Sequence, residues 1–529
     1  MDRRSFLLGT AGAATLPLAA PALAQPAGAR VLKFIPQADV AVIDPIVTTA
    51  YVTRNHGFVV YDTLYGMDAQ FKPQPQMAEG HRVEEDGRRV SITLRSGLKF
   101  HDGAPVLAKD AVASIKRWWQ RDAMGQALAA ATEELAATDD RTLTFRLKKP
   151  FALLLDALAK PGSPVCFIMP ERIAQTDANT PIKEVIGSGP FRFKGDERVP
   201  GSLVVYERNP DYLPREGGSV EWTSGPKRAN FDRVEWHVIP DASTAAGALQ
   251  SGEMDWWEQP TADLLPLLKR NRNIKVEAYD PTGLMALCRF NHLHPPFNNP
   301  GIRRALLGAT NQADYMTAVI GTDPSTWRDN VGFFPPGTPF ASDVGLAPLQ
   351  GPRDYAKVRR DLAAAGYKGE KVVLIAATDF PSLNALGQVC LDMLQKSGMN
   401  VDFVATDWGS VVTRRANRNP PDQGGWSIFL TFFTGLDFFS PAGHLGLRGN
   451  GLNAWFGWPT MPKLEALRSE WLDAPNLAEQ QRIAREIQEE GMREVPYIPA
   501  GQYFQPWTYR TNISGVLNGL PMFWNVRKG

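Results

Sequence analysis

Cysteine is scarce in this sequence. The 529 residues hold three cysteines, Cys166, Cys288 and Cys390, which are far apart and form no Cys-x-x-Cys pair. An odd and scattered set excludes a disulfide framework and a thiolate zinc site. We expect three buried free thiols, because free cysteine is among the most frequently buried residues, and a single bridge in an oxidising compartment is the alternative.

Net charge is also nearly absent. Lysine and arginine number 57 against 56 aspartate and glutamate residues, and the chain without its first 24 residues is formally neutral. Nucleic acids and anionic membranes bind concentrated positive charge, so neither is an expected partner. The length predicts two or three domains at roughly 150 residues each.

The motifs of common enzymes are missing. The sequence has no Gly-x-Ser-x-Gly elbow, no phosphate-binding loop ending in Gly-Lys-Ser/Thr and no His-Glu-x-x-His zinc motif. Scattered carboxylates such as Asp379, Asp407 and Asp437 leave a secreted hydrolase open as an alternative, since two carboxylates suffice for glycoside cleavage. We expect a protein that is not an enzyme and uses no cofactor.

Long hydrophobic runs are absent as well. Residues 1–24 have the pattern of an export signal, with the twin-arginine sequence RRSFLL at 3–8, a short apolar run and a small-residue cleavage site ending at Ala24. The run is too short to span a bilayer core of about 30 Å. No cysteine follows the cleavage site to carry a lipid, so we expect cleavage near Ala24 and a free protein in a Gram-negative periplasm.

The stretch 91–119 combines a strand, a turn and a helix. Ile92 and Leu94 alternate with polar residues, as in a half-buried strand. The helix that follows is expected to bury a face formed by Val112, Ile115 and Trp119.

Further along the chain, strands and helices alternate, which predicts an α/β architecture. Pro300 after Asn299 is typical of a helix start, Gly252 of a helix end, and Asn476 with Glu479 of a capping box.

Five segments carry a family resemblance. They are the run that begins YDTLYG at 61 and ends SIKRW at 118, GSGPFRFKGDE at 187–197, YERNPDYLP at 206–214, the block 231–255 that begins FDRVEWHVIPD, and the block 297–321 that begins FNNPGIRRALL. Taken in this order, they resemble the extracytoplasmic solute-binding proteins, family 5, of ABC importers, the group of dipeptide, oligopeptide and nickel binders.

The resemblance implies an α/β fold of the two-lobed periplasmic binding protein type II (cluster C), with an extra subdomain on lobe one. The expected limits are a signal peptide at 1–24, lobe one at 25–65, the extra subdomain at 66–185, lobe one again at 186–283, lobe two at 284–494 and a return to lobe one at 495–529.

The implied function is that of the periplasmic substrate-binding component of an ABC importer. A monomer would capture a small organic solute, peptide-like or related, between its lobes and deliver it to an inner-membrane ABC permease. Binding of a metallophore of the nickel-chelate type is the alternative. His292, His294 and His444 are the suggestive histidines, but their spacing forms no ligand set for a bare ion, so no metal site is expected.

The resemblance also suggests ligand contacts. The loop before Phe58 lies in the family's cleft, which makes Tyr51, Thr53 and Asn55 candidates, with helix capping as the structural alternative.

Two anchors of the family's peptide binders have no match here. Phe380 stands at the position of the arginine that holds the ligand carboxylate, and Leu436 at that of the aspartate that holds its amino group. Asp437 is one residue away and could serve after a small loop shift, whereas Arg414 and Arg415 are the nearest arginines. A charge-assisted hydrogen bond contributes about 1.5–3 kcal/mol, so losing both anchors weakens dipeptide capture.

Aromatic residues are plentiful in the same stretches. Flat side chains could enclose an organic ligand and exclude water, although most phenylalanines are expected to be core. The ligand candidates here are Phe380, Trp408, Phe433 and Trp455, with Asn453 as a weaker polar candidate.

Overall fold

Strands from both ends of the chain form the largest sheet. The structure is a computed structural model that describes residues 30–529, so the predicted signal at 1–24 lies outside the described residues. In spatial order the sheet holds β10 (Phe191–Phe193), β11 (Leu203–Arg208), β12 (Arg233–His237), β1 (Val31–Ile35), β13 (Trp256–Trp257), β21 (Pro506–Arg510) and β14 (Ile274–Ala278).

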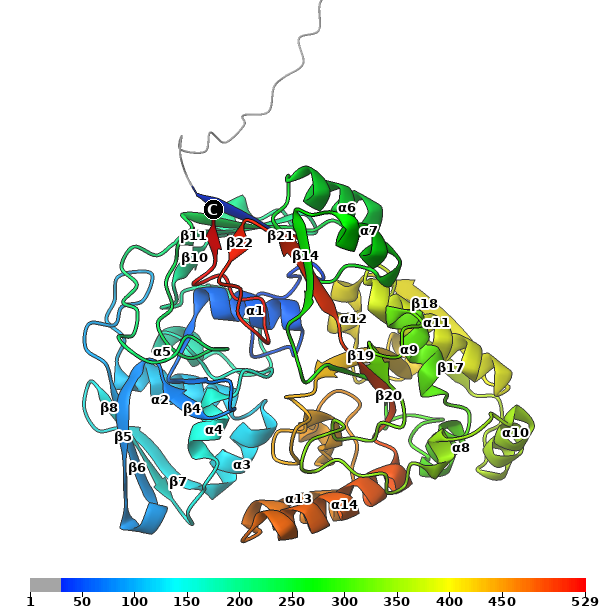
Figure 1. Ribbon diagram of the computed structural model, residues 1–529. Coiled ribbons are helices and arrows are strands. Elements are labelled where there is room, and N and C mark those ends of the chain that lie inside the picture. Colours follow the sequence, from blue (N-terminus) through cyan, green and yellow to red (C-terminus); the bar gives the residue numbers. More distant parts are fainter. Residues whose placement is uncertain (1–29) are drawn as a thin grey trace, which may run out of the picture.

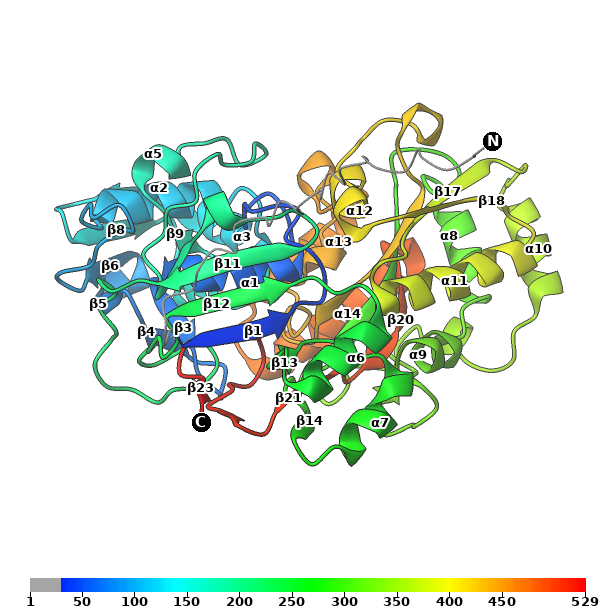
Figure 2. The same ribbon diagram turned by 90° about the horizontal axis from the view of Figure 1, so that it is seen from above.

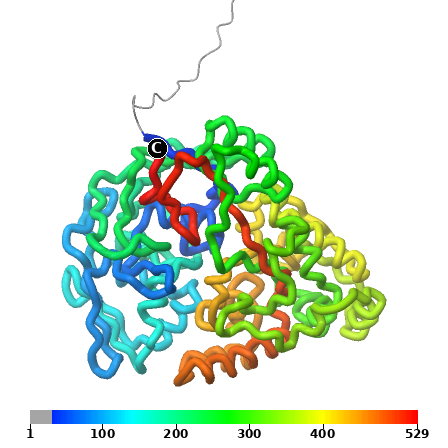
Figure 3. Tube along the Cα trace, viewed as in Figure 1, coloured from blue at the N-terminus to red at the C-terminus, as the bar shows by residue number. Residues whose placement is uncertain are grey.

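Strand β1 lies at the centre of this sheet. It pairs in parallel with β12 and with β13, and its inward residues Leu32 and Phe34 are fully buried. The C-terminal β21 lies beside β13, so the chain returns to its beginning, as Figure 3 shows where red meets blue. The helices of this lobe are α1 (Tyr51–Val60), α6 (Ala242–Ser251) and α7 (Leu265–Arg270).

A second sheet forms the other lobe. Its order is β16 (Trp327–Arg328), β20 (Tyr497–Tyr503), β15 (Leu284–Phe290), β19 (Ile428–Thr434), β17 (Lys371–Ala377) and β18 (Asn400–Thr406). Its helices are α8 (Pro300–Leu307), α9 (Gln312–Ile320), α10 (Tyr355–Ala364), α11 (Pro381–Lys396), α12 (Trp408–Arg414), α13 (Pro462–Asp473) and α14 (Leu477–Glu494). Figure 2 shows the two lobes side by side.

A smaller antiparallel sheet lies beside the first lobe. Its order is β5 (Ala78–Glu84), β6 (Arg89–Leu94), β8 (Thr142–Leu147) and β7 (Thr132–Ala137). Its helices are α2 (Ala108–Trp118), α3 (Ala123–Ala131), α4 (Leu154–Ala159) and α5 (Glu171–Ala174). Short strands pair as β2 (Asp62–Thr63) with β9 (Phe167–Ile168), β3 (Tyr65–Met67) with β4 (Pro73–Pro75), and β22 (Ile513–Ser514) with β23 (Arg527–Lys528).

Helix α2 buries a different face from the one predicted. Trp118 is fully buried and its indole nitrogen donates to the Pro164 carbonyl, whereas Val112 and Trp119 are only partly buried. Ile115 is shared by both faces and is fully buried. The prediction was wrong by about one residue, or about 100° of rotation, because alanines on the true inward face carry little hydrophobic signal.

Other local predictions are confirmed. Asn299 caps α8 by accepting from the Gly301 amide, and Asn476 caps α14 by accepting from the Glu479 amide. The second cap is one half of the predicted capping box, because the Glu479 carboxylate accepts from Arg482. Helix α6 ends at Gly252, whose φ of 84° is left-handed. Such a φ is readily available to glycine, which has no Cβ.

The expectation for cysteine is also confirmed. Cys166, Cys288 and Cys390 are free and buried. Cys288 and Cys390 approach each other to 3.8 Å between sulfur atoms in the core of the second lobe. Within residues 30–529, no helix is long and apolar enough to cross a membrane.

The chain crosses between the two large sheets twice. One crossing joins β14 to β15, and the other joins β20 to β21, which appears in red in Figure 1. Two neighbouring crossings allow the lobes to rotate about a common hinge.

A buried ion pair ties the small sheet to the first lobe. Asp44 is fully buried and accepts from the Arg117 guanidinium at 2.7 and 3.2 Å. It also accepts from the Ile182 amide at 2.9 Å, so one carboxylate connects three segments.

We predict that Asp44→Asn lowers the free energy of unfolding by about 3–5 kcal/mol, because it leaves the Arg117 cation buried without its partner. Urea denaturation followed by tryptophan fluorescence measures this. Asp402→Asn, which breaks an exposed pair with Lys371, is the control and should change little. Equal effects of the two substitutions would contradict the prediction.

Candidate ligand-binding site

Tyr51 and Asp437 form a direct contact between the two lobes. Tyr51 opens α1 in the first lobe, and Asp437 follows β19 in the second. The Tyr51 hydroxyl donates to Asp437 Oδ2 and accepts from the Thr434 amide. Burial, and next the Asp437 charge, raise the pKa of Tyr51 well above its usual range, so the phenol keeps its proton.

Asp437, not Leu436, is the residue whose side chain crosses between the lobes. The Leu436 amide donates to the Thr282 hydroxyl at 3.1 Å, next to the hinge. A Cβ added to Gly162 would lie 1.6 Å from Asp437 Oδ1, so the backbone of the extra subdomain also approaches this carboxylate closely. That Asp437 takes the place of the family's ligand-binding aspartate after a one-residue shift stays a prediction.

Six aromatic side chains form a continuous group beside this contact. Ring centroids are 5.9 Å apart for Tyr51 and Phe432, 6.2 Å for Tyr51 and Phe433, and 5.2 Å for Phe433 and Trp455. The ring centroid of Phe380 lies 5.8 Å from that of Phe432 and 5.9 Å from that of Trp408. We call this group the aromatic wall; its members are Tyr51, Phe380, Trp408, Phe432, Phe433 and Trp455.

Thr53 and Asn55 form hydrogen bonds inside the first lobe, and the ligand contact predicted for each stays a prediction. Each is 1% exposed. Thr53 donates to the Val42 carbonyl at 2.7 Å, and Asn55 donates to Glu258 at 3.2 Å. All ten residues of α1 are buried, so position on this helix does not by itself indicate exposure to a ligand.

A cavity of about 770 Å³ lies between the lobes on the hinge side of the wall. Gln37 and Asp39 line it from the end of β1, and Phe380 lines it from the start of α11. A smaller pocket of about 40 Å³ adjoins this hinge-side cavity and shares Gln37 and Gln505 with it.

The small pocket is lined by ionisable groups of both signs, the buried Arg54 and Glu258 and the half-buried Asp280. The Arg54 guanidinium lies 3.9 Å from the centre of the Tyr51 ring. Burial raises the pKa of Glu258 to about 7 and that of Asp280 to about 6. Burial also lowers the pKa of Arg54.

A cavity of about 1200 Å³, which we call the outer cavity, lies beyond the other side of the wall. Arg121 and Gln126 line it from the extra subdomain, and Arg418, Asn453 and Trp455 line it from the second lobe.

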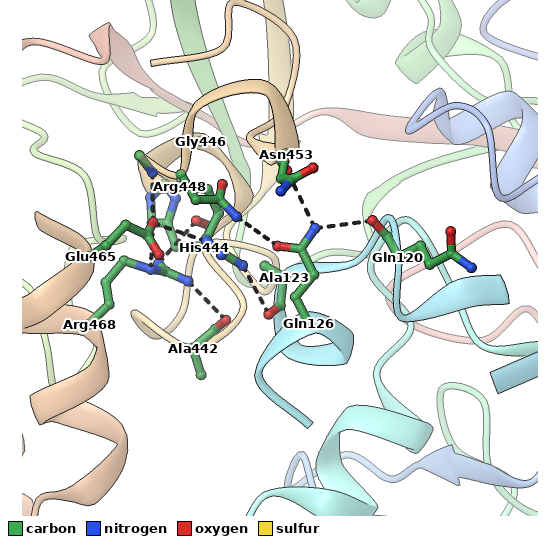
Figure 4. A network of polar contacts seen from close by, with 12 residues as sticks. Gln120, Ala123, Gln126, Ala442, His444, Gly446, Arg448, Asn453, Glu465 and Arg468 are labelled. Carbon is green, nitrogen blue, oxygen red and sulfur yellow. Dashed lines mark hydrogen bonds and ion pairs between the residues drawn. The ribbon is translucent and has the colours of Figure 1, made fainter. Parts of the chain in front are cut away.

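Polar contacts join α3 to the second lobe beside the outer cavity, and Figure 4 shows this network. Arg448 donates to the Ala123 carbonyl at 3.4 Å, and Asn450 donates to Gln126 at 3.1 Å. Gln126 donates in turn to the Asn453 carbonyl at 3.4 Å. Asn453 therefore takes part through its backbone, which sequence reasoning about its amide side chain missed.

The three suggestive histidines bond to backbone carbonyls of the second lobe. Their acceptors are Pro496 for His292, Arg418 for His294 and Phe333 for His444, at 3.1, 2.8 and 2.9 Å. In the part of the chain that the structure describes, no group of three or more His, Cys, Asp or Glu side chains could hold a metal ion.

Sequence reasoning missed several charged residues at these cavities. Arg54 stands in the segment that yielded Tyr51, and Arg121 and Arg418 lie in segments that resemble ordinary surface. Glu258 and Asp280 come from distant parts of the chain. A single sequence holds no signal that pairs such positions, because tertiary contacts bring them together.

Two lobes that are joined by two crossings and close on interlobe cavities define a ligand-binding protein of the periplasmic type. Solved structures of this class share the fold. The ABC transporter-associated periplasmic binding protein DppA of Helicobacter pylori, in complex with the peptide STSA, has a TM-score of 0.76 at 21% identity, and the match covers 94% of this chain and 98% of that one. The agropinic acid complex of AgaA from A. tumefaciens R10 has a TM-score of 0.76 at 20% identity, covering 94% and 99%.

The family follows from the sequence comparisons. The family model described as "Bacterial extracellular solute-binding proteins, family 5 Middle" matches residues 72–446. A probable peptide ABC transporter periplasmic-binding protein of Sinorhizobium fredii is 36% identical over 493 residues, which cover 93% of this chain and 92% of the relative. The chain therefore belongs to family 5 of the bacterial extracellular solute-binding proteins, which confirms the predicted family and the two-lobed α/β fold.

Stability should depend on pH through Glu258. Its carboxyl has a pKa near 7 when folded and about 4.3 when unfolded. The folded state therefore holds an extra proton between these values, and its stability falls as the pH rises through that window.

We predict that the unfolding free energy of the wild type, relative to Glu258→Gln, decreases by about 3 kcal/mol from pH 4 to pH 8. Melting curves across this range measure it. Glu253→Gln at an exposed glutamate nearby is the control and should show no such drift. A difference between wild type and Glu258→Gln that stays constant with pH would contradict the assignment.

Proposed function

We propose that this protein is the periplasmic substrate-binding component of an ABC importer for a peptide-like solute. The carrying observation is the contact of Tyr51 with Asp437, which joins the two lobes at the small interlobe pocket that Tyr51 lines. The relative named as a peptide-binding component and the peptide complex with the same fold support the solute class. Family 5 is a solute-binding family, and its members deliver small solutes to ABC permeases.

The finer features of this proposal come from the sequence. The chain is exported by the twin-arginine pattern, cleaved near Ala24, and works as a monomer with an inner-membrane ABC permease. It performs no turnover, since the lobes only enclose and release the solute.

Asp437 supplies the negative charge that recognises an amino group of the solute. In the structure its carboxylate accepts from the Tyr51 hydroxyl and from the Thr434 hydroxyl, the latter at 3.2 Å. When a solute ammonium group replaces one of these hydroxyl donors at Asp437, a charged donor takes the place of a neutral one. Charge-assisted hydrogen bonds are roughly twice as strong as neutral ones. The aromatic wall excludes water from this exchange.

Lobe closure then couples binding to delivery. The solute stabilises the closed state because it contacts both lobes, and it shifts the equilibrium only by its differential affinity for that state. The permease distinguishes the loaded protein by the surface that closure creates.

Mass spectrometry of the small molecule released on denaturing protein purified from periplasm tests the function. We expect a peptide-like compound that raises the melting temperature when added back, since a ligand at 100 times its Kd stabilises by about 2.7 kcal/mol. Release of a chemically altered compound on incubation would overturn the proposal.

We predict that Asp437→Asn weakens binding of that compound tenfold or more, because a charge-assisted hydrogen bond of about 1.5–3 kcal/mol is lost. Isothermal titration calorimetry measures the change. Leu436→Ala is the matched control at the neighbouring position and should stay within about threefold. A larger loss for Leu436→Ala would restore Leu436 as the determinant.

A further inference from the structure

The outer cavity is lined by charges of one sign only. Its ionisable side chains are Arg121, Arg418 and Arg448, and none of its lining residues is an aspartate, glutamate or lysine. Arg448 is neutralised by Glu465 at 3.1 Å. In the described residues, neither Arg121 nor Arg418 forms an ion pair with a carboxylate within 4 Å. Arg418 is exposed and Arg121 is half-buried, and Asp177 and Asp44 attract Arg121 only from farther away.

Neutral groups hold these two guanidinium groups in place. Arg121 donates to the Asn179 amide oxygen at 2.6 Å, and Arg418 donates to the Leu452 carbonyl at 3.0 Å. Arg418 also lies 5.3 Å from the centre of the Trp458 ring. Burial lowers the pKa of Arg121, and the next contribution is repulsion from Arg418, which places the two cations within electrostatic range of each other.

A third unpaired cation lies behind the cavity wall. Arg415 is 1% exposed, and it donates to the hydroxyls of Thr48 and Thr49 at 3.2 and 3.5 Å, while its Nε atom has no partner. Both threonines line the outer cavity, and so does Trp455, whose ring centre lies 6.0 Å from the guanidinium. The rings of Trp408, Phe429 and Phe456 also face this guanidinium, at 5.2, 5.7 and 5.0 Å. Since no carboxylate of the described residues pairs with it, Arg415 adds a third positive charge beside the cavity.

We propose that the outer cavity binds the negatively charged part of the solute, so that the transported compound is an organic acid with carboxylate groups. The inference rests on the proposed function, because it assigns a charge class to the same solute. Arginine is suited to this role, since its planar fork of donors matches a carboxylate.

The uncharged residues that line the outer cavity indicate which other groups the compound contains. Amide side chains such as Gln120, Asn179 and Asn417 offer hydrogen bonds, and Trp119, Trp455 and Trp458 offer flat apolar surfaces. Within the peptide-like class, these features fit an acidic peptide better than an apolar one. The compound reaches the aromatic wall at Trp455, which borders the outer cavity and contacts Phe433.

The test compares two dipeptides of equal size, Glu-Glu and Gln-Gln, with citrate and inorganic phosphate as anions that are not peptides. Calorimetry on the full mature protein should show Glu-Glu binding at least tenfold more tightly than Gln-Gln. Arg121→Gln and Arg418→Gln should each weaken Glu-Glu tenfold or more, and should weaken Gln-Gln, which keeps only its terminal carboxylate, much less. Arg88→Gln, which removes an exposed charge outside the cavity lining, is the matched control.

The outcomes separate this inference from the function it rests on. Gln-Gln binding as tightly as Glu-Glu would overturn the anion site and leave peptide binding standing. Citrate or phosphate binding that needs Arg121 and Arg418, with no dipeptide binding, would keep the anion site and overturn the peptide class. Binding of none of the four would overturn both.

A measurement on the wild type alone tests the anion site even if one of the variants fails to fold. Salt screens charge interactions, so raising sodium chloride from about 0.05 to 0.5 M should weaken Glu-Glu binding severalfold more than Gln-Gln binding. Equal salt dependence of the two dipeptides would overturn the inference.

Discussion

The two crossings at the hinge are the constraint on which the rest of the structure depends. Gln502 donates to the Thr282 carbonyl at 2.8 Å, and the Gly435 amide donates to the Gly283 carbonyl at 2.8 Å, so the crossings and the loop after β19 are tied together. Each lobe carries its own sheet and core. Relative motion is therefore confined to rotation about these segments, and every interlobe contact forms or breaks together.

Charge at the lobe interface is distributed unevenly. On the hinge side, Arg54 shares a pocket with Glu258 and Asp280, so both signs are present. On the outer side, the charges that lack a carboxylate partner are all arginines, and one of them, Arg415, is enclosed by aromatic rings. The aromatic wall separates these environments, so a solute with distinct charged ends would meet a different field on each side.

Much of the fold was predictable from local pattern. The strand at β6, the helix start at Asn299 and the cap at Asn476 follow from alternation and capping chemistry, which act over a few residues. The site was less predictable. Thr53 and Asn55 have the polarity of ligand contacts but bond inside the first lobe, and Asp437 rather than Leu436 crosses to Tyr51.

The sequence by itself determined the family, the α/β class and the burial of the cysteines, because repeated motifs and hydrophobic periodicity are local properties of the chain. The tertiary structure alone decided which side chains meet. Arg121 and Arg418 stand almost three hundred positions apart and face one cavity. Only the packing of one lobe against the other brings these two arginines to the same cavity, and the charge of the binding site depends on that packing.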